Sequence, residues 1–152
     1  PGQLDTLSKV GIRAYRGLDP NWYCGLRGGL SRVGHLLDCL LTLAPPVSNV
    51  LQSRGGLLDV TGSYLLWGSG GFRRWIPQSC RARQIDKGIS RCIHECALFH
   101  LWMHPIDIAY KTRSVLDTLR RSLERVARHR EAGELSVMTM AEVARQYLSG
   151  RE

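Results

Sequence analysis

Residues 97–104 carry bulky side chains at almost every position, which predicts a buried strand. In an extended chain the odd-numbered side chains point to one face, whereas the even-numbered ones, including His100 and His104, point to the other. Strands that are bulky on both faces are typical of parallel sheets covered by helices, and Pro105 has no N–H for a further ladder hydrogen bond. The pattern therefore places His104 at the carboxyl end of a buried strand.

Apolar periodicity alternates between strand and helix along the rest of the chain. Short alternating runs predict strands over residues 12–16, 57–65 and 135–138, besides 97–104. Helical spacing predicts helices over residues 3–10, 31–44, 81–93, 114–132 and from 139 onward. Such alternation predicts an α/β fold with mostly parallel strands and covering helices.

Capping signals set the expected helix boundaries. Ser31 is the expected cap of a helix whose apolar stripe is formed by Val33, Leu37, Leu40 and Leu41. Two S/T-x-x-D/E capping boxes open the last two helices, and they are Ser114 with Asp117 and Thr139 with Glu142. Gly133 is expected to end the first of these two helices.

Composition indicates an ordinary soluble chain. Its 152 residues correspond to one domain, 43% are hydrophobic and 22% are charged. No run reaches the roughly 18 apolar residues of a membrane span, so we expect no membrane partner. The five cysteines are odd in number and irregularly spaced, and no signal peptide is readable from Pro1, so we expect reduced thiols and a cytoplasmic location.

The formal charge of +8 suits an anionic partner. Most basic residues fall within residues 73–91 and 113–130, and those of the second segment lie on the outer face of an amphipathic helix. This distribution favours a solvated helix face over a nucleic-acid groove.

A group of thiols and imidazoles invites a zinc interpretation. The group consists of Cys92, His94, Cys96, His100 and His104. Cys92 belongs to the buried face of the predicted helix, and four residues of strand separate the two later histidines by about 13 Å. The spacing therefore favours buried free thiols over a structural zinc site. Neither a nucleophile elbow, a Walker loop nor a dinucleotide fingerprint is present.

His104 has two possible roles. It is either a core side chain with a hydrogen bond at a strand end or a general acid or base at the sheet edge, with Asp107 orienting its ring. Ser63 could pair with His104 as nucleophile and base only if the fold brings them together. For His100, which lies deeper in the strand, we favour a structural role.

Several runs of the sequence resemble a known family. They are residues 99–105 with the helix 114–130, residues 132–135 and 139–142, and the earlier runs 11–17 and 19–23, whereas residues 57–63 match loosely. Together they look like the carboxyl end of bacterial polysaccharide deacetylases with a NodB-type domain. The resemblance extends over nearly the whole chain.

The resemblance implies a distorted, TIM-like β/α barrel and a carbohydrate esterase activity that hydrolyses the acetamide of N-acetylated sugars. In that family an aspartate and two histidines near the amino end hold a divalent metal, usually zinc, which activates water and polarises the carbonyl, and an aspartate is the base. A histidine after the last long strand protonates the leaving amine. His104 matches that catalytic residue, and the resemblance makes His100, Trp102 and Asp107 candidates for the substrate pocket.

The amino half of the chain contains neither Asp-Asp-Gly nor His-x-x-x-His. The resemblance therefore implies one partial domain, residues 1–152, that forms the carboxyl half of the barrel. Its expected partners are the amino-terminal half, with the zinc site, and a polysaccharide or N-acetylated sugar. Two alternatives remain, namely a non-catalytic module that binds an anionic polymer through its basic surface, and a structural fragment without independent function.

Overall fold

The computed structural model describes residues 3–17, 21–42, 45–49, 51–54, 56–67, 76–109 and 112–149. The α-helices are α1 (Gln3–Lys9), α2 (Gly29–Leu41), α3 (Gln78–His94), α4 (Pro105–Ala109), α5 (Thr112–Glu131) and α6 (Met140–Ser149). The strands are β1 (Ala14–Tyr15), β2 (Gln52–Arg54), β3 (Leu57–Asp59), β4 (Tyr64–Leu65) and β5 (Leu101–Trp102), and Trp22–Gly25 forms the 3₁₀ helix η1.

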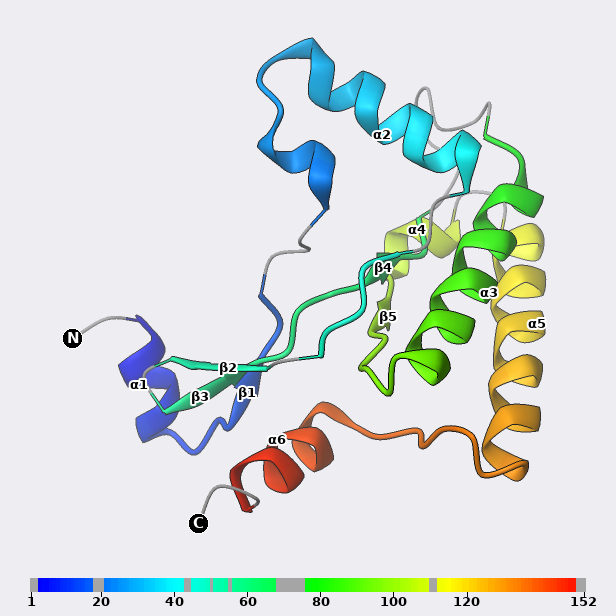
Figure 1. Cartoon of the computed structure of the whole chain (residues 1–152). Coiled ribbons are helices and arrows are strands. Elements are labelled where there is room, and N and C mark those ends of the chain that lie inside the picture. The colour runs from blue at the N-terminus through cyan, green and yellow to red at the C-terminus, as the bar shows by residue number, and fades with distance from the viewer. Residues whose placement is uncertain are drawn as a thin grey trace.

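The strands form two small sheets. In the first, β3 pairs with β1 in parallel and with β2 in antiparallel orientation. In the second, β4 and β5 are parallel. Figure 1 shows β1, β2 and β3 at one end of the molecule and β4 and β5 beside α3. The predicted α/β class is confirmed, and the strands within the described ranges do not close into a barrel.

The predicted strand over residues 57–65 is interrupted. It divides into β3 and β4 because the chain changes its hydrogen-bond partner between them. Val60 N donates to Tyr15 O at 2.9 Å, next to β1, and Ser63 N donates to His100 O at 2.9 Å, next to β5. One buried extended segment, residues 57–66, thus joins the two sheets.

The prediction of a long buried strand over residues 97–104 was wrong in length and burial. Only Leu101 and Trp102 are in a strand, Leu98 forms an isolated bridge with Ser48, and the side chains are half-buried, with His104 exposed. The reason is that β5 pairs with β4 alone among the described strands. The predicted alternation is confirmed, since odd-numbered side chains pack on the α3–α5 core and Leu98 packs on a second cluster.

Helix α2 differs from its prediction in boundaries and orientation. It begins at Gly29, with Gly28 rather than Ser31 as the cap, and ends before Thr42, which adopts a left-handed conformation. The predicted apolar stripe is exposed, with 53% of Val33 and 63% of Leu41 accessible. The helix instead packs its Gly34 against η1. The two backbones approach so closely there that a Cβ atom at Gly34 would lie 2.9 Å from the Cβ of Tyr23.

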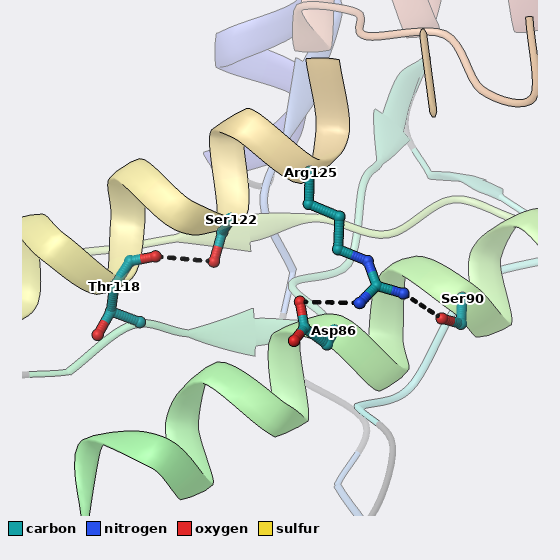
Figure 2. A network of polar contacts seen from close by, with 5 residues as sticks. All are labelled: Asp86, Ser90, Thr118, Ser122 and Arg125. Carbon is teal, nitrogen blue, oxygen red and sulfur yellow. Dashed lines mark hydrogen bonds and ion pairs between the residues drawn. The ribbon is translucent and has the colours of Figure 1, made fainter. Parts of the chain in front are cut away.

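Helices α3 and α5 form the largest core. The predicted helix over 81–93 lies within α3, and its buried Ile85 and Ile89 form one cluster with Val115 of α5. Figure 2 shows Arg125 of α5 reaching α3, where its Nη1 lies 3.4 Å from Asp86 Oδ1 and its Nη2 donates to Ser90 Oγ at 2.9 Å. These polar contacts are partly exposed, so they contribute little to stability compared with the apolar packing.

The two capping-box predictions have different outcomes. The first was wrong, because α5 begins at Thr112 and Ser114 lies inside it, where its Oγ accepts from Gln78 Nε2. The second is confirmed, since Thr139 N and Oγ1 donate to Glu142 Oε2 at 2.6 and 2.8 Å. These bonds, the backbone one foremost, hold the pKa of the Glu142 carboxyl below its ordinary value.

Residues 135–138 do not form the predicted strand. They run in extended conformation from α5 to α6 without a strand partner, and Val137 and Met138 are exposed. As predicted, a turn at Gly133, whose φ is +73°, follows the end of α5. The glycine-rich run over residues 68–71, which the sequence predicts to be a loop, lies outside the described residues.

Gly88 provides a test of the packing between α3 and the residues before β5. A Cβ atom at this buried position would lie 2.5 Å from Phe99 Cε2. We expect Gly88→Ala to lower the free energy of unfolding by about 1–3 kcal/mol, since overpacking outweighs the gain in helix propensity. Urea unfolding followed by circular dichroism measures this change. Gly29→Ala is the control, because a Cβ there meets no atom within 4 Å. A Gly88→Ala protein as stable as the parent would contradict the packing.

Candidate functional site

A side chain that follows β1 contacts the carboxyl end of β5, although the two strands belong to different sheets. Arg16, which follows β1, places its Cζ 3.6 Å from the centre of the Trp102 ring at the end of β5. The His104 ring lies edge-on to the same indole, with the ring centres 4.9 Å apart and the planes at 89°. Arg16, Trp102 and His104 are called the carboxyl-edge cluster below. A cation over an indole face is a favourable arrangement and holds the ring in place.

Asp59 at the end of β3 was missed in the sequence. Its Oδ2 accepts from Tyr15 Oη at 3.1 Å, and its Oδ1 is buried without a hydrogen-bond partner among the described residues. A Cβ atom at Gly17 would lie 2.1 Å from Asp59 Oδ1, so the glycine makes room for the carboxylate. The only signal in the sequence is an acidic residue within the apolar run over residues 57–60.

His104 is exposed and lies two residues beyond the end of β5. Its backbone oxygen accepts from Asp107 N at 3.0 Å, at the start of α4. The two residues are therefore close along the backbone, whereas the orientation of the His104 ring by Asp107 stays a prediction.

His100 and Ser63 hold β4 and β5 together. Ser63 Oγ accepts from His100 N at 3.0 Å, while His100 O accepts from the backbone N–H groups of Ser63 and Tyr64. His100 Nδ1 is buried and has no hydrogen-bond partner within the described residues. The contact that Ser63 makes is thus with the His100 backbone, and no hydrogen bond to His104 is found in the described part of the chain.

The thiols are separate from the carboxyl-edge cluster. Cys92 Sγ donates to Ala97 O at 2.6 Å, and burial is the main cause that raises the pKa of this thiol. Among the described residues Cys80, Cys92 and Cys96 are free thiols. Within the described ranges, no group of three or more His, Cys, Asp or Glu side chains is arranged to hold a metal ion.

The basic residues of α5 are mostly exposed. Arg120 pairs with Glu124 and Arg125 with Asp86, while Arg121 and Arg128 face solvent. This exposure is what a solvated helix face requires, and binding of an anionic polymer by this face stays a prediction. No helix of the described residues combines the length and the apolar character that crossing a membrane requires.

A cavity of about 370 Å³ lies between η1, α2, β4 and α3. Its wall includes Tyr23, His35, Asp38, Tyr64, Trp67 and Gln84. None of the four predicted site residues, His100, Trp102, His104 and Asp107, lines it, although all four are described. Sequence periodicity gave no sign of this cavity, because its walls come from segments that are distant in the chain.

Comparison with known proteins gives no relative. No protein-family model matches the chain, and neither the curated proteins nor the solved structures contain a significant match.

The Ser63 hydroxyl offers a test of how β4 and β5 are joined. Ser63 is 3% exposed, so Ser63→Ala leaves the His100 N–H buried without its acceptor. We expect the variant to lose about 1–3 kcal/mol of unfolding free energy, measured by urea unfolding. Ser136→Ala, at an exposed position, is the matched control and should be neutral. Equal stability of the two variants would show that this bond does not fix the strand pair.

Proposed function

We propose that this chain is the carboxyl-terminal part of a NodB-type polysaccharide deacetylase barrel, and that His104 is its catalytic acid. The observation that supports the proposal is the carboxyl-edge cluster, in which an exposed imidazole follows a parallel strand and rests against an indole. In barrels and open α/β sheets the carboxyl ends of the strands are where ligand sites form. The sequence resemblance supplies the reaction class.

The reaction is hydrolysis of an acetamide on a sugar. The oxygen of water forms a bond with the carbonyl carbon, the C–N bond breaks, and the nitrogen departs with its electron pair. That nitrogen needs a proton to leave as an amine, and the other product is acetate. A protonated His104 donates this proton, which is the general-acid role that imidazole fills most often in enzymes.

The neighbours of His104 have supporting roles in this proposal. Trp102 offers its indole to the apolar face of a sugar ring, and Arg16, stacked on the indole, keeps it in position. His100 acts through the backbone, because its N–H and C=O fix β5 against β4. Asp107 lies in the first turn of α4, where its backbone N–H donates to His104 O, and we assign its side chain to the substrate pocket on the resemblance alone.

The zinc ion that the resemblance implies does not fit the described residues, since they provide no cluster of ligands. We therefore assign the metal to the amino-terminal part of the barrel, and no step described above passes through it. The same part would supply strands beside β4 and β5, which pair only with each other among the described strands.

The acid role of His104 is tested in the full-length protein. We expect His104→Ala to lower the rate of acetate release from an N-acetylated oligosaccharide by about 10²–10⁴-fold, because the amine loses its proton donor. Metal content, measured by atomic emission, should stay unchanged. His94→Ala is the matched control, since His94 is exposed at the end of α3.

Two results would contradict the assignment. An unchanged rate in His104→Ala would exclude the acid role, and loss of the metal in that variant would assign His104 to metal binding. A full-length protein that releases no acetate from any N-acetylated sugar would exclude the deacetylase function itself.

A further inference from the structure

The cavity between η1, α2, β4 and α3 is distinct from the carboxyl-edge cluster. Its volume of about 370 Å³ falls in the usual range of small-molecule sites. None of Arg16, Trp102 and His104 lines it. The cavity therefore needs an explanation of its own.

The hydroxyl of Tyr64 identifies the cavity as a place for a hydrogen-bonding ligand. Tyr64 lines the cavity and is 8% exposed, and its hydroxyl is buried with no hydrogen-bond partner among the described residues. Burial is the main cause that raises the pKa of this phenol, so the hydroxyl keeps its proton. Buried polar groups in native proteins nearly always have a partner. A ligand oxygen in the cavity would provide one.

Other polar groups in the wall suit a ligand that both donates and accepts hydrogen bonds. Trp22 Nε1 donates to Asp38 Oδ1 at 3.1 Å, and Gln84 Nε2 donates to Asp38 Oδ2 at 3.4 Å and to its backbone oxygen at 3.0 Å. The carboxylate is thus fixed, and it still has lone pairs for a ligand hydroxyl. Arg32, exposed at the cavity, has the opposite charge, so the wall favours a neutral ligand.

The aromatic part of the wall favours a ring that is not flat. Tyr23 and His35 have ring centres 5.0 Å apart at 64°, and His35 and Trp67 have centres 6.3 Å apart at 54°. These inclined rings offer a curved apolar wall rather than a parallel slot. A flat heteroaromatic ring stacks best in a slot, whereas the C–H face of a pyranose fits a curved aromatic surface.

We propose that this cavity is a non-catalytic binding site for one neutral sugar ring. The Tyr64 hydroxyl donates to a sugar oxygen, and Asp38 accepts from a sugar hydroxyl. The rings of Tyr23 and His35 contact the C–H face, whereas Trp67, which is 3% exposed and carries Arg81 on its ring, supports His35 from behind. The inference rests on the proposed function in one respect only, which is that the sugar is a unit of the same polysaccharide. Binding itself requires no deacetylase chemistry.

The test measures binding of single sugars to the chain of residues 1–152. The probes are N-acetylglucosamine and glucose, with adenosine and inorganic phosphate for comparison, and the readouts are saturation-transfer NMR and tryptophan fluorescence. We expect saturable sugar binding that Tyr64→Phe weakens about five- to tenfold, since one hydrogen bond is lost. Asp38→Asn, which removes the charge and replaces one acceptor oxygen with an NH2 donor, should also weaken it.

Stability separates a local effect from a folding defect. Tyr64→Phe removes an unsatisfied hydroxyl, so its thermal midpoint should equal or exceed that of the parent. Tyr147→Phe is the matched control, because the Tyr147 hydroxyl donates to Leu51 O at 2.5 Å in a different core. It should lower the midpoint and leave sugar affinity unchanged.

Four results would overturn the site. They are no binding of either sugar, equal binding by the parent and Tyr64→Phe, tighter binding of phosphate or adenosine than of sugar, and loss of sugar binding in His104→Ala instead of Tyr64→Phe. Because acetate release is not a readout here, the sugar site can fail while the deacetylase proposal holds. The reverse is equally possible.

Discussion

The extended segment over residues 57–66 is the constraint on which the rest of the structure depends. At its start Leu58 N and Val60 N donate to backbone oxygens of Arg13 and Tyr15, and at its end Leu66 N donates to Trp102 O. It is largely buried, so each unmade backbone bond would cost about 1–3 kcal/mol. Both partners run parallel to this segment, with the last residue of β1 opposite Asp59 and the last residue of β5 opposite Leu65. The segment joins the two sheets in Figure 1, and the Arg16 side chain extends from the end of β1 to the Trp102 ring.

That placement creates the candidate site. Arg16 and Trp102 are far apart in sequence, yet the shared segment brings them into contact, and His104 follows two residues after Trp102. The helices provide the rigid support, since α3 and α5 bury Ile85, Ile89 and Val115 against the side of β5 that carries Leu101. The proposed acid therefore follows a backbone fixed by packing, while its own side chain is exposed.

Local sequence patterns correctly predicted the structural features that are set by residues close together in the chain. The α3 helix, the Thr139–Glu142 capping box and the alternation around Phe99 were all predicted, because helix periodicity, capping and strand alternation are set within a few residues. His104, predicted as the last residue of a buried strand, lies two residues beyond the shorter β5. The α/β class followed from the order of these elements.

What sequence reasoning missed depends on distant partners. The division of 57–65 into β3 and β4 results from a change of partner from β1 to β5, which no local pattern encodes. The exposed face of α2 was predicted as a core stripe, because amphipathicity does not show that Gly34 and not Leu37 meets η1. Asp59 and the cavity around Tyr64 likewise arise from contacts between separate segments.

The contact between Arg16 and Trp102 tests the central claim most directly, because it exists only if the segment over 57–66 joins the two sheets as described. The measurement is the proton NMR spectrum of residues 1–152 with nuclear Overhauser contacts to the Trp102 indole. With the guanidinium carbon 3.6 Å from the ring centre, the account predicts upfield-shifted Arg16 side-chain protons that contact the indole and return to ordinary shifts in Trp102→Leu. Arg16 protons with ordinary shifts and no contact to the indole in the parent protein would contradict it.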